Sequence, residues 1–265
     1  MNHQLLRLID SHVHLDEIND LEIAIDQAKA VGIMAFLAVG QDYQSNQQVL
    51  DICTRHSGLI FPALGLHPWH LGGMDSVEID HNLRFIEDHI DIAVGVGEIG
   101  LDYHKRVRAV AGKELQKEVF SALLSLAKRY NKPVSVHSRY AWKDCFDLVK
   151  ESGVTKAVFH WFTGFSSTLG DIIDAGYFIS VTPAVEYHEE HRRAIKETPL
   201  TRLLLETDAP VRYGMAIKYE SRPSDIIRAL GTAAQLKGVD KETAAEQTTD
   251  NAMRLFGLTF IAGRT

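Results

Sequence analysis

Apolar runs rich in β-branched residues alternate along the chain with stretches of helical periodicity. Short apolar runs bounded by turn residues are typical of buried strands, and strands that alternate with helices indicate parallel βαβ units. The runs that we assign to strands are Leu5–Ile9, Ile33–Val39, Leu59–Leu66, Ile92–Val96, Pro133–Val136, Ala157–Phe159, Tyr177–Val181 and Arg202–Leu205. Eight such units in 265 residues predict an α/β fold, a (β/α)8 barrel of the TIM type.

Three helical stretches support this prediction. In Lys113–Tyr130 apolar residues recur every three or four positions, so we expect an amphipathic helix that ends near Asn131. A similar pattern in Leu21–Val31 is closed by a glycine. The stretch Lys241–Phe256 follows the eighth strand, and we expect it to pack against the barrel as an extra C-terminal helix. Because no Pro-rich or Ser-rich segment divides the sequence, we predict one domain over residues 1–265.

Composition limits the partners. The chain is 45% hydrophobic, which is enough for one large core. Its net charge is -7, so no overall positive field attracts nucleic acid. A nucleic-acid substrate would have to be bound by a local patch of basic residues or by a metal ion. The two cysteines, Cys53 and Cys145, form no CxxC motif and are expected to be buried thiols. No apolar run reaches membrane-spanning length, so we expect a cytoplasmic monomer without a membrane partner.

Metal-ligand residue types stand where the predicted strands end. His12 and His14 follow the first strand and are spaced to face the same side of an extended chain. Glu98 follows the fourth strand between Gly97 and Gly100, which let other groups approach closely. The fifth, sixth and eighth strands are followed by His137, by His160, and by Glu206 and Asp208. In a (β/α)8 barrel these ends form the face that holds the active site.

Four histidines with Glu98 and Asp208 match a divalent cation such as Zn, Mn or Mg. Six ligands are too many for one tetrahedral ion with an open position, so we predict two ions that share a bridging carboxylate. Glu98 lies between the other ligands in barrel order and is the expected bridge. The two groups are His12, His14 and Asp208 for one ion, and His137 and His160 for the other. Asp208 is also placed to accept a proton from the attacking nucleophile.

These motifs resemble those of the TatD family of metal-dependent hydrolases, and within it the YjjV-type branch. The matching segments are His12-Val13-His14, Gly97-Glu98-Ile99-Gly100-Leu101-Asp102-Tyr103, His137-Ser138-Arg139, His160-Trp161-Phe162-Thr163-Gly164 and Glu206-Thr207-Asp208-Ala209-Pro210. The likeness extends to Asn251-Ala252-Met253-Arg254-Leu255-Phe256 and so covers nearly the whole chain. The resemblance implies a barrel of the metallo-dependent hydrolase superfamily, a divalent-metal site and deoxyribonuclease activity, and it supports the ligand assignment residue by residue.

Three further segments bear on the substrate. Gly65-Leu66-His67-Pro68 resembles the family motif after the third strand, which implies that His67 contacts a substrate phosphate. A loop histidine beside a turn proline fits the same residues. Trp161 stands where the family more often has a small residue, and Ser221-Arg222-Pro223 stands where many members have an Asn-x-Pro turn. Both departures lie near the predicted barrel mouth, so they concern substrate choice.

Basic residues follow the fourth and fifth strands. Lys105, Arg106 and Arg108 come shortly after the fourth, and Arg139 lies two residues beyond His137. Such a run is often only solvated charge, but at the barrel mouth it is placed to contact substrate phosphates. We count Arg139, Lys105, Arg106, His67 and Glu206 as substrate-binding candidates. The other histidines are assigned to the surface: His3, His56, His70, His81, His89, His104, His188 and His191.

We therefore expect a divalent-metal-dependent hydrolase of phosphodiester bonds that acts on DNA or a small phosphodiester, with Asp208 and Glu98 as catalytic residues. One alternative is an amidohydrolase or lactonase on the same barrel. Many of those use a carboxylated lysine as the bridge from the fourth strand, where this chain has Glu98. A second alternative is a barrel whose metal only stabilises the fold. Structural zinc sites are closed and usually four-coordinate, unlike six ligands at an open mouth.

Overall fold

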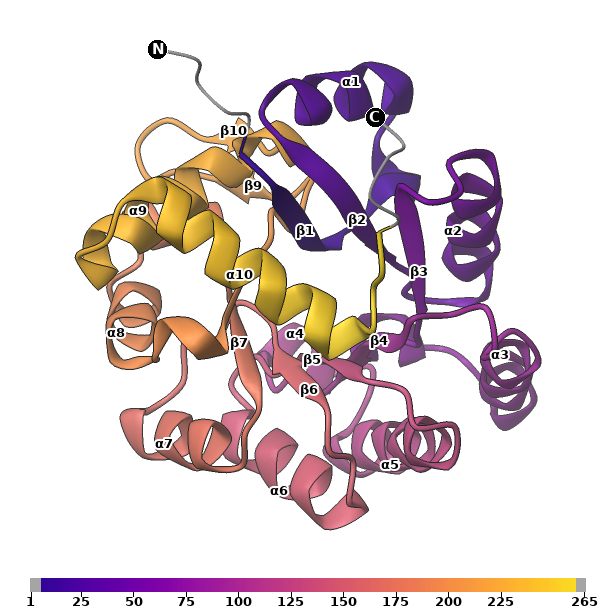
Figure 1. Cartoon of the computed structure of the whole chain (residues 1–265). Coiled ribbons are helices and arrows are strands. Elements are labelled where there is room, and N and C mark those ends of the chain that lie inside the picture. The colour runs from indigo at the N-terminus through magenta and orange to yellow at the C-terminus, as the bar shows by residue number, and fades with distance from the viewer. Residues whose placement is uncertain (1–5, 261–265) are drawn as a thin grey trace.

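Eight parallel strands follow one another around a barrel in the order of the sequence (Figure 1). This computed structural model describes residues 6–260. The strands are β1 Leu8–Val13, β2 Ile33–Val39, β3 Ile60–Leu64, β4 Gly95–Gly100, β5 Val134–His137, β6 Ala157–Phe159, β7 Phe178–Val181 and β8 Leu203–Leu205. Each strand pairs in parallel with the next. The predicted (β/α)8 barrel is confirmed, whereas one domain over residues 1–265 stays a prediction.

The barrel closes just beyond the ends of β1 and β8. The backbone N–H of Asp208 donates to the carbonyl of His12 at 2.9 Å, and that of His14 donates to the carbonyl of Ala209 at 2.9 Å. Two of the predicted metal-ligand segments therefore form the seam of the barrel.

Helices cover the outside of the barrel (Figure 1). They are α1 Leu21–Ala30, α2 Tyr43–Arg55, α3 Ser76–Asp88, α5 Lys113–Arg129, α6 Trp142–Ser152, α7 Ser166–Asp174, α8 Glu189–Glu197 and α9 Ile226–Lys237. The loops contain α4 Lys105–Arg108, the hairpin of β9 Arg212–Tyr213 and β10 Tyr219–Glu220, and the 3-10 helices η1 Leu15–Glu17, η2 Pro68–Leu71, η3 Pro183–Glu186, η4 Leu200–Arg202 and η5 Pro223–Asp225. Within residues 6–260, no helix is both long and apolar enough to cross a membrane.

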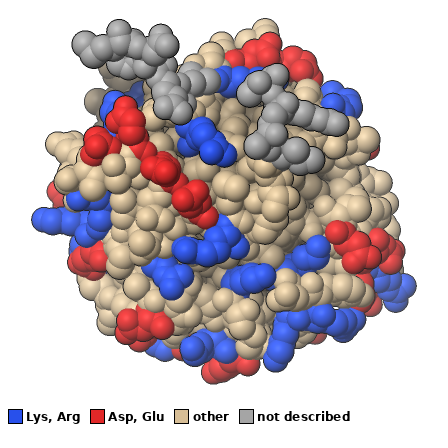
Figure 2. Space-filling model, in the orientation of Figure 1, with Lys and Arg blue, Asp and Glu red and all other residues tan. Residues whose placement is uncertain are grey.

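The last helix, α10 (Lys241–Phe256), covers the amino-terminal ends of the strands with the predicted bounds. The Asn251 amide donates to the carbonyls of Leu200 at 2.9 Å and Leu203 at 2.8 Å, which fixes the helix beside β8. Leu255 and Phe256 pack with inward residues of the strands. Figure 2 shows a row of acidic side chains over α10, where Glu242, Glu246 and Asp250 are exposed. This end of the barrel is closed by a helix with an acidic outer surface.

Two strand predictions were wrong in their bounds. The first strand was expected over Leu5–Ile9, but β1 continues to Val13, and Leu5 lies outside the described residues. The fourth was expected over Ile92–Val96, but Ile92 is 60% exposed and β4 begins at Gly95. In both cases the apolar pattern stops before the strand ends, because the polar residues that point into the barrel mouth still belong to the strand. His12 and Glu98 are therefore held by strands rather than by loops.

One histidine assigned to the surface is buried. His191 in α8 has no exposed area, and its Nδ1 lies 3.0 Å from the Phe162 carbonyl. Its Nε2 accepts the backbone N–H of Thr182 at 3.2 Å, so it links the chain after β6 to the chain after β7. The surface assignment of His191 was wrong because α8 directs it inward, and His3 lies outside the described residues. Of the cysteines, Cys145 is buried as predicted and Cys53 only partly.

Gly65 allows the chain after β3 to lie against β4. A Cβ at this position would be 2.4 Å from the Glu98 carbonyl oxygen, a backbone atom that has little freedom to move. We expect Gly65→Ala to lower the free energy of unfolding by about 2 kcal/mol, as overpacking does. Gly170→Ala in α7 is the control, since a Cβ there meets nothing within 4 Å and helix propensity should rise. Equal urea midpoints for Gly65→Ala and the wild type would contradict this close approach.

Candidate metal centre

Three predicted ligands meet at the seam between β1 and β8. The Asp208 carboxylate oxygen Oδ1 lies 3.2 Å from His14 Nε2 and 3.7 Å from His12 Nε2. Asp208 has a φ of 50°, which non-glycine residues adopt rarely. The backbone hydrogen bond to His12 holds it in this conformation. The ligand atoms of the three residues are close enough to share one ion.

The Glu98 carboxylate lies between the two predicted groups of ligands. Its Oε2 faces β1, at 3.4 Å from His12 Nε2 and 3.6 Å from His14 Nε2. Its Oε1 faces β5 and β6, at 2.8 Å from both His137 Nδ1 and His160 Nε2. The two oxygens of one buried carboxylate are thus divided between two sets of imidazoles.

His67 belongs to the second set. Its Nε2 lies 3.4 Å from Glu98 Oε1, and its ring is 4.4 Å from that of His137, centroid to centroid. The ligand atoms of His67, Glu98 and His137 are close enough to share an ion. The contact of His67 to substrate stays a prediction, and its position makes it a candidate metal ligand as well. We call Glu98, His67 and the other five predicted ligands the metal cluster: His12, His14, His137, His160 and Asp208.

The charges of the metal cluster depend on one another. Burial alone would raise the pKa of Glu98, but the surrounding imidazoles, those of His67 and His160 foremost, hold it well below its ordinary value. Burial would lower the pKa of His14, yet the hydrogen bond and charge of Asp208 raise it to about 9. Burial lowers the pKa of His67 to about 4. At neutral pH Glu98 is therefore ionised and His67 is neutral, as metal binding requires, whereas His14 is protonated and has to release its proton when an ion binds.

The donor set fits a divalent ion. His12 Nε2 and His160 Nδ1 are buried and have no hydrogen-bond partner among the described residues. A buried polar atom without a partner is unfavourable by roughly 1–3 kcal/mol, so its presence calls for an explanation. An ion bound at His12 Nε2 would satisfy that atom, and imidazole with carboxylate is a usual ligand set for Zn and Mn.

Residues around the metal cluster orient its imidazoles. Asp102 Oδ2 lies 3.2 Å from His137 Nε2 and accepts the indole N–H of Trp69 at 2.6 Å. Burial would raise the pKa of Asp102, but the hydrogen bond to His137 lowers it to about 2. On the other side, Ser135 Oγ lies 3.1 Å from His12 Nδ1. No role was predicted for Asp102, Trp69 or Ser135, although Asp102 stands in the same glycine-rich motif as Glu98.

Glu206 is placed behind the metal cluster rather than at its mouth. Its side chain is fully buried, with Oε1 at 3.6 Å from His160 Nδ1 and 3.1 Å from the backbone N–H of Trp161. It therefore has no exposed surface for a substrate to contact, contrary to its selection as a substrate-binding residue. A signal was available in the sequence, since Glu206 directly follows the buried run of β8.

The predicted cations lie on the loops that follow β4 and β5. Lys105, Arg106 and Arg108 are exposed on α4, and Arg139 is exposed just after β5. Within residues 6–260 none of the four forms an ion pair, so their charges are available to a ligand. None of them is hydrogen-bonded to a metal-cluster residue in the described part of the chain.

The two departures from the family pattern have structural partners. The Trp161 ring packs edge-on against Tyr213 at 5.3 Å, and its backbone has a φ of 40°. Arg222 pairs with Asp20 and donates to Gln27 at 3.0 Å, so it anchors the segment before η5 to the region of α1. Trp161 thus borders the metal cluster through Glu206, whereas Arg222 serves as a distant anchor.

Comparison with known proteins gives a consistent result. The family model described as "TatD related DNase" matches residues 9–257, which include every residue of the metal cluster. The human protein "Deoxyribonuclease TATDN3" is 33% identical over 259 residues, which are 94% of each chain. The Escherichia coli K12 protein "Uncharacterized metal-dependent hydrolase YcfH" is 32% identical over 262 residues, 94% of this chain and 95% of the other.

A solved structure agrees in fold. The TatD homologue YJJV of Escherichia coli K12 superposes with a TM-score of 0.86 at 27% identity, covering 97% of this chain and 100% of that one. Family, fold and donor chemistry all point to catalysis with a divalent metal. The chain belongs to the TatD-related DNase family and is a metal-dependent hydrolase.

Proposed function

We propose that the protein hydrolyses phosphodiester bonds, in DNA or in small phosphodiesters, with two divalent ions held on either side of Glu98. The observation that carries this proposal is the division of the Glu98 carboxylate, with Oε2 toward His12 and His14 and Oε1 toward His137 and His160. A carboxylate shared in this way is typical of two-metal hydrolases.

The ligands separate into two groups. The first ion would be held by His12, His14 and Asp208 with one oxygen of Glu98, and the second by His137 and His160 with the other oxygen. His67 lies within reach of the second ion or of a phosphate beside it. A set rich in imidazole favours Zn or Mn over Mg, which prefers oxygen ligands. All these side chains come from one chain, which is consistent with activity as a monomer.

The chemistry follows from the positions of these residues. Bound divalent ions would lower the pKa of water and stabilise negative charge on phosphoryl oxygens. Asp208, at the seam of the barrel, accepts the proton that the attacking water releases. The water oxygen forms a bond to phosphorus while the bond to the leaving ester oxygen breaks. The leaving oxygen takes up the proton that Asp208 accepted, directly or through solvent, which leaves a phosphomonoester and an alcohol. Glu98 keeps the two halves of the metal cluster at a fixed separation throughout.

Buried acceptors position the histidines for this role. Asp102 can accept the Nε2–H of His137, which leaves the lone pair of Nδ1 directed at Glu98. Glu206 Oε1 lies 3.6 Å from His160 Nδ1, at ion-pair rather than hydrogen-bond distance, and we assign it to positioning this ring instead of substrate binding. Partners of this kind fix the tautomer and ring orientation of metal-binding histidines.

Two features favour phosphodiesters over amides or lactones. Glu98 stands on β4, where many amidohydrolases of this barrel type carry a carboxylated lysine. The four unpaired cations Lys105, Arg106, Arg108 and Arg139 stand on loops at the same end of the barrel as the metal cluster. The protein has a net charge of -7, but these unpaired cations beside its catalytic centre can bind substrate phosphates locally.

Asp208→Asn tests the proton acceptor while preserving side-chain volume. We expect the variant to stay folded but to lose at least about a hundredfold in turnover of a chromogenic phosphodiester, because it lacks a general base and a charged ligand. Thermal melting and kinetics are measured on the same samples. Asp250→Asn, on the exposed side of α10, is the matched control and should behave as the wild type. A folded Asp208→Asn enzyme with full turnover would remove Asp208 from the mechanism.

The loop cations are tested by replacing Lys105, Arg106 and Arg108 together by Ala. The loss in kcat/KM should be larger for single-stranded DNA than for the small phosphodiester, and the difference should shrink as salt rises, because only the longer substrate carries additional phosphates.

The control for this variant replaces Lys29, Lys128 and Lys150 by Ala. These are exposed residues in the last turns of α1, α5 and α6, at the opposite end of the barrel, and the net charge changes equally. Equal losses on both substrates would show that α4 does not bind phosphate. Lactone or amide turnover without phosphodiesterase activity would favour the amidohydrolase alternative.

A further inference from the structure

Three aromatic side chains form a continuous row at the mouth of the barrel. Tyr140 follows β5, Trp142 begins α6, and Phe165 precedes α7. The ring of Trp142 lies 5.9 Å from that of Tyr140 and 5.4 Å from that of Phe165, centroid to centroid. Tyr140 is 56% exposed and Phe165 is 69% exposed. Single exposed apolar side chains are common, but adjoining aromatic rings with this exposure mark a binding surface.

The row stands on the same loops as the metal cluster. His137 ends β5 three residues before Tyr140, and His160 follows β6 five residues before Phe165. Trp69, which is 53% exposed, extends the aromatic surface toward β3 and reaches His137 through Asp102. The row and the metal cluster therefore stand at the same end of the barrel, on the segments that follow β5 and β6.

Tyr140 is held outward by an unusual backbone conformation. Its φ is 57°, in the left-handed region that bulky residues seldom occupy. The guanidinium of Arg139 lies 5.6 Å from the centre of its ring. Strained conformations persist where surrounding structure maintains them and are concentrated at functional sites. The ring of His104 is stacked 6.2 Å from that of Tyr140, and the arrangement places an exposed aromatic side chain and an unpaired cation together at the surface.

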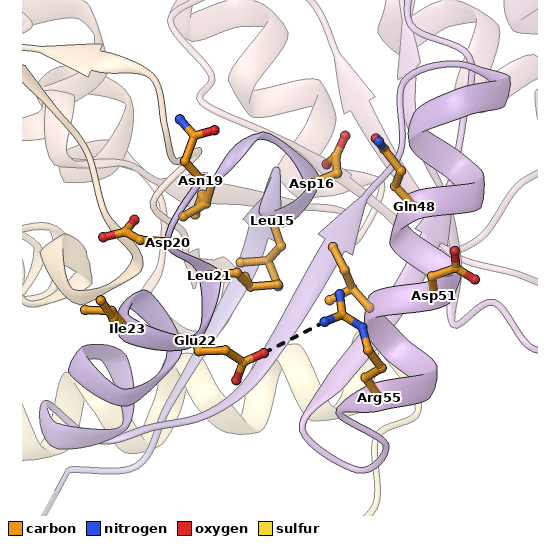
Figure 3. A pocket seen from close by; sticks show the side chains of 12 residues that line it. Leu15, Asp16, Asn19, Asp20, Leu21, Glu22, Ile23, Gln48, Asp51 and Arg55 are labelled. Carbon is orange, nitrogen blue, oxygen red and sulfur yellow. Dashed lines mark ion pairs between the residues drawn. The ribbon is translucent and has the colours of Figure 1, made fainter.

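The charge of the barrel rim differs between its two sides. Beside the row lie the unpaired cations of α4 and Arg139. Beside η1, between α1 and α2, lies a cavity of about 560 Å³ (Figure 3). Four carboxylates line it, those of Asp16, Asp20, Glu22 and Asp51, with Arg55 paired to Glu22. Asp20 is also paired, with Arg222, so among the described residues Asp16 and Asp51 are the carboxylates of this cavity without an ion pair. A polyanion that reaches the metal cluster is therefore attracted to the side with the aromatic row and not to the cavity side.

We propose that Tyr140, Trp142 and Phe165 form a stacking subsite for the bases of a single-stranded polynucleotide. This inference rests on the proposed phosphodiesterase function and specifies its substrate. Aromatic side chains beside basic ones bind single strands because every base has a face for stacking and every linkage a phosphate for the cations. In a duplex the base faces are already stacked on one another, so the row selects single strands or frayed ends.

The test compares an oligonucleotide of thymidine with an abasic oligonucleotide of equal length. Binding is followed by fluorescence anisotropy in the metal-loaded Asp208→Asn background, where cleavage is slowed at least about a hundredfold, and intact strand is verified after each measurement. Adding Tyr140→Ala and Phe165→Ala should raise the Kd for the thymidine strand by about tenfold or more, the magnitude expected for lost base stacking. The Kd for the abasic strand should rise by less than about twofold, since its phosphates still meet the cations. Tyr130→Ala, an exposed aromatic at the end of α5, is the control.

The outcomes separate the two proposals. A Kd that changes equally for both strands, or for neither, would overturn the stacking subsite and would leave the row to another partner such as a protein. Hydrolysis of a small phosphodiester by the wild-type enzyme tests the proposed function independently, because that substrate does not reach the row. Discrimination between the two strands that persists in the Tyr140→Ala and Phe165→Ala variant, together with intact phosphodiesterase activity of the wild type, would reject this inference alone.

Discussion

The structure depends on keeping one charged carboxylate buried at the centre of the barrel mouth. Glu98 is 3% exposed, and an isolated ionised carboxylate in that environment is strongly unfavourable. Five imidazoles approach its two oxygens from β1, β5, β6 and the loop after β3. The backbone is adapted to this arrangement, since Gly65 lets the neighbouring chain lie against Glu98 and the seam between β1 and β8 fixes His12 and His14.

The sequence was sufficient for the parts of the molecule that have a regular pattern. Strand order, α10 and the convergence of the candidate ligands other than His67 could be predicted, because parallel strands bring their carboxyl ends to one face. The ends of β1 and β4 could not, since hydrophobicity does not distinguish a loop from a strand whose polar residues point inward. Asp102 and His191 were missed for a related reason. Their roles depend on partners far apart in the sequence, Trp69 and His137 for Asp102, and Phe162 and Thr182 for His191.

The two ends of the barrel are specialised differently. One is closed by α10, with Asn251 bound to the backbone before β8 and an acidic outer surface. The other holds the metal cluster, flanked by an acidic cavity on one side and by cations and aromatic rings on the other. Although the chain is negatively charged overall, the arc of its surface formed by these loops carries the cations and aromatic rings that suit a polynucleotide. The metal cluster lies within the residues that the family model matches, and the arc is made by side chains of the loops after β4, β5 and β6.

The metal content of the purified protein tests the account most directly. The protein is stripped with a chelator, reconstituted with Zn or Mn, freed of excess ion by gel filtration and examined by elemental analysis. We predict about two ions per chain for the wild type, and clearly fewer for Glu98→Ala, which removes the ligand shared by both sites. Wild-type protein that retains no ion, or a folded Glu98→Ala variant that still retains two, would contradict a two-metal centre bridged by Glu98.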